Sequence, residues 1–113
     1  MILNEVKIAG RVYKYNEFTT SKGKTIARFG LQFYNGKGLD GKSQYTFVDC
    51  KGFKSFGLNE KDDIIVFGHL GGEEWTDKQG SKRSRVCLLV ESVDSQNDEK
   101  FIEEHKFSNN PFV

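Results

Sequence analysis

The sequence predicts an all-β protein, a five-stranded Greek-key barrel followed by a short acidic tail. Glycine is abundant with twelve residues, proline occurs once, and there are ten phenylalanines and four tyrosines. This mix favours twisted strands and tight turns over helices. Apolar residues recur with a period of two in several segments, and turn-forming residues separate these segments. A chain of 113 residues is long enough for about one domain with one core.

The first half of the chain predicts three strands. The first covers Asn4–Tyr15, where aliphatic residues alternate with basic ones and produce one apolar and one basic face. A turn at Thr19–Thr25 joins it to a second strand, Thr25–Tyr34, and the two form a hairpin. The segment Asn35–Lys42 contains three glycines and is expected to be a mobile surface loop. The third strand covers Gln44–Phe53.

The second half predicts two more strands and a tail. The linking segment "KSFGLNEKDD" is too short for more than one turn of helix. Ile64–Leu70 has apolar residues on both faces and indicates a buried strand. A turn at Asp77–Gly80 precedes the fifth strand, Arg85–Val93. We therefore expect a domain over residues 1–93 and a disordered acidic tail over residues 94–113.

The net charge of +1 conceals an uneven distribution. Residues 1–93 carry a net charge of +4 and residues 94–113 carry −3. A basic body attracts a polyanion if its bases share one face, and an acidic tail often forms a separate contact. The sequence has no apolar run near the ~20 residues that cross a membrane and no signal-peptide pattern, so a cytoplasmic location is expected.

Enzymatic and metal chemistry find little support in the sequence. It has no glycine-rich phosphate loop, no Ser/His/Asp arrangement and no H-x-E motif. The acidic pairs Asp62–Asp63 and Glu73–Glu74 are neighbours on strand ends, where successive side chains point to opposite faces. No histidine has a ligand-type neighbour at metal spacing, so we expect no catalytic residue, cofactor or metal. Cys50 and Cys87 favour two small buried thiols, and a disulfide remains the alternative if their strands are adjacent.

The third strand carries the most informative pattern. Alternation separates Phe47, Lys51 and Phe53 from Val48 and the rest of the opposite face. Aromatic residues in β proteins usually fill cores, but a lone lysine almost never points into one. Lys51 therefore indicates that its two aromatic neighbours face outwards beside positive charge. Exposed aromatic rings beside bases are typical of proteins that hold single-stranded nucleic acid. Trp75, the single tryptophan, either caps the core or offers its ring to such a partner.

From Asn4 to Val93 the chain resembles the bacterial-type single-stranded DNA-binding proteins. The resemblance lies in "NEVKIAGRV", "SKGKTIARFGLQF", "YTFVDCKGF" and "DDIIVFGHLGGEEWTDKQGSKRSRVCLLVESV". The last segment is the most specific, because it contains G-x-L followed by W-x-D-x-x-G at the spacing of that family. The resemblance implies an OB-fold barrel that wraps single strands and usually assembles as a homotetramer.

The same resemblance implies roles for individual residues. Phe47 and Phe53 take stacking positions on the third strand, and Trp75 takes the tryptophan position of the last hairpin. Tyr34, or its neighbour Phe33, lies nearest to the remaining stacking position of the family. The expected phosphate contacts are basic residues, with Arg28, Lys51 and Lys82 foremost. The full set is Lys7, Arg11, Lys22, Lys24, Arg28, Lys51, Lys54, Lys82, Arg83 and Arg85.

Several features depart from the family pattern. The segment between the third and fourth strands is too short for the family's helix, and Glu73 and Glu74 stand where relatives have basic or neutral residues. These two acids either face away from a bound strand or mark a different binding path. The end "NNPFV" keeps Pro111 and Phe112 of the family's partner-binding tail, but without adjoining acids. The trimmed chain resembles a phage or mobile-element version of the family.

The sequence thus predicts a protein that coats and protects single-stranded DNA during replication, recombination or repair. The alternative is an OB-fold adaptor that binds other proteins in a replication or recombination assembly. The resemblance implies a homo-oligomer, either dimer or tetramer, and the Asn4–Val12 edge is the natural pairing site. The choice between DNA and RNA stays open, because stacking and phosphate contacts tolerate both.

Overall fold

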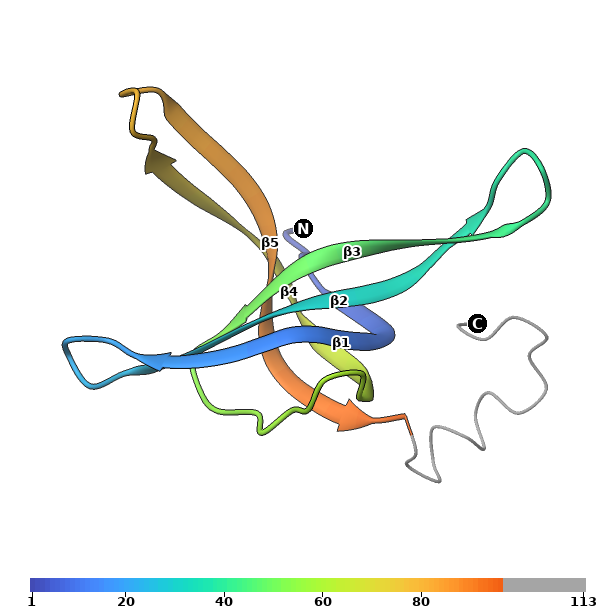
Figure 1. Ribbon diagram of the computed structural model, residues 1–113, viewed down its shortest axis with the longest axis horizontal. Coiled ribbons are helices and arrows are strands. Elements are labelled where there is room, and N and C mark those ends of the chain that lie inside the picture. Colours follow the sequence, from blue (N-terminus) through green and yellow to red (C-terminus); the bar gives the residue numbers. More distant parts are fainter. Residues whose placement is uncertain (97–113) are drawn as a thin grey trace.

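The computed structural model describes residues 1–96, and within them all regular structure is β (Figure 1). The strands are β1 (Val6–Thr19), β2 (Thr25–Lys37), β3 (Ser43–Gly52), β4 (Asp63–Thr76) and β5 (Lys82–Ser95). They close into a barrel in the order β1-β2-β3-β5-β4. The prediction of an all-β, five-stranded barrel is confirmed. The predicted start of the disordered tail at residue 94 is wrong, because Asp94 and Ser95 pair with β4 as the end of β5. Residues 97–113, which include the predicted partner-binding residues Pro111 and Phe112, lie outside the described residues.

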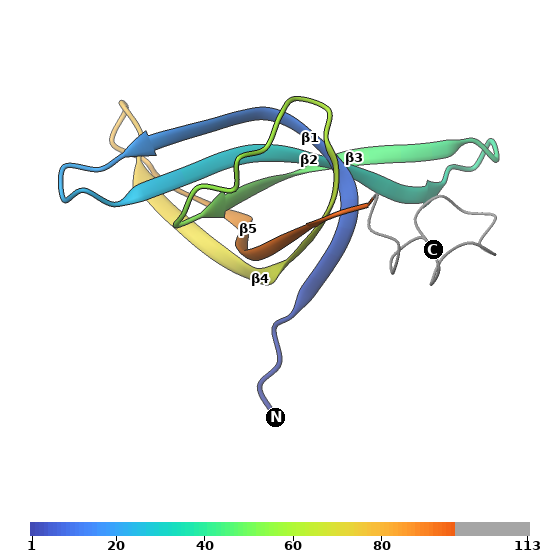
Figure 2. The same ribbon diagram turned by 90° about the horizontal axis from the view of Figure 1, so that it is seen from below.

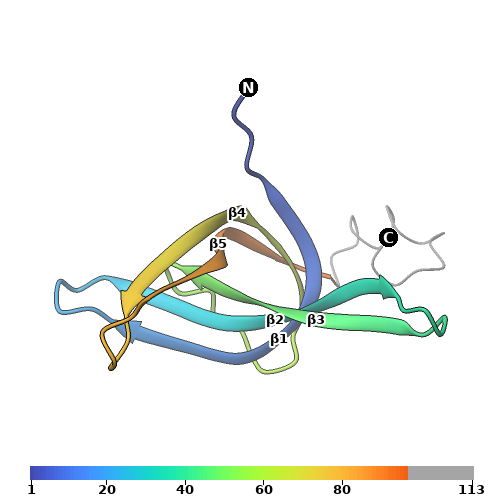
Figure 3. The same ribbon diagram turned by 90° about the horizontal axis from the view of Figure 1, so that it is seen from above.

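A short parallel contact closes the barrel. Four strand pairs are antiparallel: β1 with β2, β1 with β4, β2 with β3, and β4 with β5. The fifth pair, β3 with β5, is parallel and joins Cys50 to Leu88 and Lys51 to Leu89. Figures 2 and 3 show β4 and β5 crossing one side of the sheet formed by β1, β2 and β3. This closure brings the β4–β5 hairpin beside β3.

The core lies where the two layers cross and consists mainly of aliphatic side chains. Ala27, Phe29 and Leu31 point inwards from alternate positions of β2, as the period of two predicts. Cys50 and Cys87 are buried and free, which confirms the interpretation as two buried thiols. Burial raises the pKa of the Cys50 thiol to about 12, with smaller contributions from Asp49 and Cys87. The Cys50 thiol therefore stays protonated near neutral pH.

The strands extend further than the sequence pattern predicts. β1 continues past Tyr15 to Thr19, β4 continues past Leu70 to Thr76, and β5 starts at Lys82. These additions lengthen the β1–β2 and β4–β5 hairpins, which project beyond the barrel as the β2–β3 hairpin also does (Figure 1). Beyond the core, the backbone hydrogen bonds between strands continue, but no side chain has to be buried there. The alternation of apolar and polar residues therefore stops in the sequence before the strand ends. The glycine-rich segment 35–42 accordingly contributes its first residues to β2, and the chain reverses between Gly38 and Lys42.

A bulge in β1 faces the link between β3 and β4. The β1–β2 register shifts between Tyr13 and Asn16, and Lys14 adopts a left-handed φ of 57°. A non-glycine residue in this region is uncommon and needs support from its surroundings. That support includes the Lys14 backbone N–H, which donates to a Glu60 carboxylate oxygen over 2.9 Å. The link, residues 53–62, contains no helix, in line with the shortness of "KSFGLNEKDD".

Candidate nucleic-acid interface

The outward face of β3 presents aromatic side chains to solvent. Phe47 is 58% exposed and Phe53 is 63% exposed, whereas Cys50 on the opposite face is 2% exposed. The prediction that the two phenylalanines face outwards is therefore confirmed. Phe47 meets the ring of Tyr13 edge to face, with 5.6 Å between the ring centroids. Phe53 has the Lys51 ammonium 5.5 Å from its ring centroid. Each of these two rings thus has a neighbouring side chain and is still more than half exposed.

Sequence reasoning missed Tyr13 and Lys14. Both line a hollow of about 450 Å³ beside Phe47, together with Arg28 and Gly30. A Cβ on Gly30 would stand 3.6 Å from the Tyr13 carbonyl oxygen and 3.7 Å from the ring of Phe47, at ordinary contact distance, so Gly30 lies directly beside both. The alternation of β1 assigns Tyr13 to the basic face with Arg11, and this signal was available in the sequence. The bulge that turns Lys14 towards the hollow had no such signal.

A second hollow adjoins the first and contains a cluster of charges. It measures about 510 Å³ and is lined by Arg28, Lys51, Glu73, Glu74, Trp75 and Arg85. Glu73 is the centre of the cluster. Arg28 Nη2 lies 2.8 Å from Glu73 Oε1, and Lys51 Nζ lies 3.3 Å from the same oxygen. Arg85 Nη2 lies 2.8 Å from Glu73 Oε2. Three strands thus contribute bases to one carboxylate.

These contacts determine the protonation of Glu73. Partial burial alone would raise its pKa, but hydrogen bonds from Arg85, Arg28 and Lys51 outweigh burial and lower the pKa to about 2. The carboxylate is therefore charged at any physiological pH. Glu74, the next residue, is exposed, and its side chain alternates with that of Glu73 along β4. The two acids therefore differ: Glu73 pairs with three bases, whereas Glu74 also lines the second hollow but has no ion pair among the described residues.

Trp75 lies at the far end of the second hollow. Its side chain is 45% exposed, and the Arg85 guanidinium carbon lies 5.5 Å from the ring centroid. The turn predicted at Asp77–Gly80 is present, with the Gly80 N–H donating to the Asp77 carbonyl over 3.0 Å. Arg83 Nε lies 2.9 Å from an Asp77 carboxylate oxygen. Trp75 is not among the partly buried residues that pack against the core of the described chain, so it does not cap the core.

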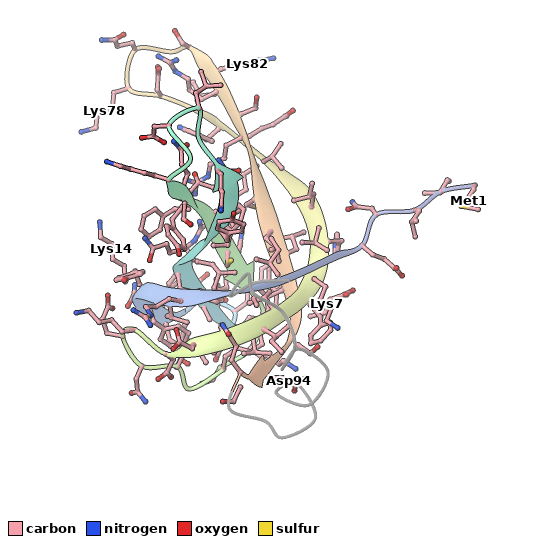
Figure 4. The ribbon with its side chains drawn as sticks, turned by 90° about the vertical axis from the view of Figure 1, so that its right-hand side faces the viewer. Met1, Lys7, Lys14, Lys78, Lys82 and Asp94 are labelled. Atoms are coloured by element: carbon pink, nitrogen blue, oxygen red, sulfur yellow. The ribbon has the colours of Figure 1, made fainter. Side chains whose placement is uncertain are left out.

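A third hollow of about 410 Å³ continues from Trp75 to Lys82 and Arg83. The first two hollows share Arg28 and Arg85, and the last two share Glu74 and Trp75. We call the three together the aromatic groove. It runs from Tyr13 and Phe47, past the cluster around Glu73, to the tip of the β4–β5 hairpin. Lys82 lies at that tip (Figure 4).

Other predicted residues lie away from the aromatic groove. Lys7 and Lys14 project from opposite sides of the barrel in Figure 4, and the Lys7 ammonium lies 5.3 Å from the ring centroid of Phe67. Arg11 Nε pairs with an Asp63 carboxylate oxygen over 2.9 Å. Two further predicted residues contact aromatic rings elsewhere. Tyr34 meets Tyr45 at 5.9 Å between centroids, and Lys54 lies 5.5 Å from the ring centroid of Phe56.

Comparison with known proteins places this arrangement in context. The chain is 27% identical to a single-stranded DNA-binding protein of Helicobacter hepaticus, over 94% of this chain and 68% of the relative. The resemblance seen in the sequence is confirmed. The fold matches the SSB of Plasmodium falciparum, solved in complex with ssDNA. The TM-score is 0.69 and the identity 16%, covering 83% of this chain and 93% of the other. No protein-family model matches the chain.

Between residues 1 and 96, no helix is long and apolar enough to cross a membrane. In the same part of the chain, no three His, Cys, Asp or Glu side chains gather as a metal site would require.

Proposed function

We propose that this protein binds single-stranded DNA without sequence preference, through the aromatic groove and the adjoining ring of Phe53. The observation that carries the proposal is the exposure of Phe47, Phe53 and Trp75 beside the bases Lys51 and Arg85. Exposed rings and bases in alternation match a ligand that exposes both base faces and phosphates. A duplex hides its base faces, so it cannot use these rings.

Aromatic rings and basic side chains of the groove contact different parts of the single strand. Nucleobases stack on Phe47, Phe53 and Trp75, and each stack contributes about 1–3 kcal/mol. Because every base has a flat face, stacking does not depend on sequence. Phosphates contact the basic residues along the groove, foremost Arg28, Lys51, Lys82, Arg83 and Arg85. Each phosphate contact with a single strand adds about −0.7 to the log–log slope of affinity against salt.

The wider role follows from the similarity to the Helicobacter hepaticus protein, which spans nearly the whole chain. We infer that the protein coats and protects single strands during DNA replication, recombination or repair. It acts by binding, not as an enzyme, and works in the cytoplasm as a homo-oligomer. Residues Pro111 and Phe112 are proposed to contact replication or recombination proteins. Among the remaining predicted bases, Lys7, Arg11 and Lys54 lie outside the groove and are assigned secondary contacts.

The single tryptophan provides the test. The protein is titrated with oligo-dT and with duplex DNA of equal length, and Trp75 fluorescence is followed at low and at moderate salt. The proposal predicts quenching by oligo-dT, weaker binding at the higher salt, and little response to the duplex. No quenching and no salt-sensitive binding to oligo-dT would overturn the proposal and favour the protein–protein adaptor.

A further inference from the structure

Glu73 occupies the basic centre of the aromatic groove. Its side chain is 17% exposed, and its two oxygens take hydrogen bonds from Arg28, Lys51 and Arg85 over 2.8 to 3.3 Å. Arg85 also has a second acidic neighbour, since its Nη1 lies 3.4 Å from an Asp49 carboxylate oxygen. Three bases therefore face two carboxylates. The groove is much less positive here than its bases alone would make it.

A carboxylate and a phosphate group compete for the same donors. Both offer negatively charged oxygens to guanidinium and ammonium groups, and both prefer short charge-assisted hydrogen bonds. A phosphate that arrives in the second hollow meets bases whose N–H groups already point to Glu73. It either uses the donors that remain, close to a negative charge, or displaces the carboxylate. In either case the strand binds less tightly than to the bases alone.

Two of the three bases have neighbours besides Glu73, whereas Arg28 pairs with Glu73 alone among the described residues. Arg85 retains its contact with Asp49 and lies over the ring of Trp75, 5.5 Å from the centroid. Lys51 lies 5.5 Å from the centroid of Phe53. Loss of the charge on Glu73 would leave these two bases in place and more available to phosphate. We therefore expect the loss of competition at Lys51 and Arg85 to exceed the loss of positioning at Arg28.

We propose that Glu73 is an internal competitor for phosphate that limits the affinity of the groove for single strands and speeds their release. The inference rests on the proposed function and adds a specific role for one acidic residue within the same groove. It also answers the question that the two acids raised in the sequence. Glu73 pairs with the bases on the expected path of the strand and regulates binding there, whereas Glu74 lines the groove without pairing with any of these bases.

The test compares Glu73→Gln with Glu74→Gln. Both variants remove one negative charge from neighbouring positions of the same hairpin, but only Glu73 contacts bases in the structure. Affinity for oligo-dT is measured at several salt concentrations, and release is followed by stopped-flow fluorescence. Glu73→Gln is expected to bind roughly fivefold more tightly, about the effect of one screened charge pair, with slower release. The log–log slope of its affinity against salt concentration should steepen by about 0.7 for each basic residue that contacts a phosphate in place of residue 73.

Other outcomes decide against the proposal. Weaker binding by Glu73→Gln would show that the carboxylate positions the bases, and equal effects of the two variants would show a general charge effect. Asp49→Asn provides a second measurement, because Asp49 is mostly exposed and contacts only Arg85 of the three bases. It should tighten binding by a smaller factor, and unchanged or weaker binding would contradict the competition. If the unsubstituted protein does not bind oligo-dT, the proposed function itself fails.

Discussion

Removal of the two exposed phenylalanines of the β3 face tests the stacking surface directly. In a Phe47→Ala, Phe53→Ala double variant, the binding energy lost should be the sum of two independent stacks. The two positions are six residues apart, about 20 Å in an extended strand, which exceeds the range over which substitutions couple. With about 1–3 kcal/mol per stack, the loss is at least about 2 kcal/mol. Affinity for oligo-dT should therefore fall roughly thirtyfold or more.

The fold should tolerate these substitutions. Both rings are more than half exposed, so their removal leaves no cavity. The main cost is the edge-to-face contact of Phe47 with Tyr13, about 0.5–1.5 kcal/mol. Binding is measured by titration with oligo-dT, and folding by thermal unfolding. Leu39→Ala is the matched control, because Leu39 is a fully exposed apolar residue in the β2–β3 turn. A folded double variant that binds like the control would refute the stacking surface.

Three further predictions concern charge, core and pH. Lys82→Ala should flatten the log–log slope of oligo-dT affinity against salt by about 0.7. Lys7→Ala should flatten it less, because Lys7 lies outside the groove and makes only a secondary contact; equal effects would contradict the groove. Leu31→Ala should lower the free energy of unfolding by about 2–5 kcal/mol in denaturant titration, because Leu31 is fully buried; a loss below about 1 kcal/mol would contradict the assigned core. The pKa of Glu73 is lowered to about 2 in the fold, from an ordinary value of 4.5. The ionised carboxylate therefore stabilises the fold fully above pH 4.5, and this contribution to the free energy of unfolding is lost as the pH falls towards 2. The melting temperature of the unsubstituted protein should therefore exceed that of Glu73→Gln at pH 6, and the gap should close at acidic pH; a pH-independent gap would contradict the assignment.

The fold was largely predictable because the barrel segments carry strong local signals. Alternation located the inward residues of β2 and the outward phenylalanines of β3, and glycine marked the turns. The projecting ends of β1, β4 and β5 were missed, since strands without a core face show no alternation. The bulge at Lys14 was also missed, because its left-handed backbone depends on a contact with Glu60, far away in sequence.

The charge cluster was only half predictable. A turn at Asp77–Gly80 sets the β4–β5 register, and that register places Glu73 opposite Arg85. The contacts of Glu73 with Arg28 and Lys51 require the parallel closure of β3 on β5, which no local pattern encodes. The sequence therefore indicates which basic residues are present, but it does not show which of them pair with an acidic side chain in the fold.

The central claim is that single strands bind along the groove, and photocrosslinking locates them most directly. An oligo-dT that carries 5-iododeoxyuridine at several positions is bound, irradiated and analysed by mass spectrometry of the crosslinked peptides. The groove predicts crosslinks at Phe47, Phe53 and Trp75, which are lost when unlabelled oligo-dT competes. Crosslinks confined to Phe67, which lies beside Lys7 and outside the groove, would contradict the account.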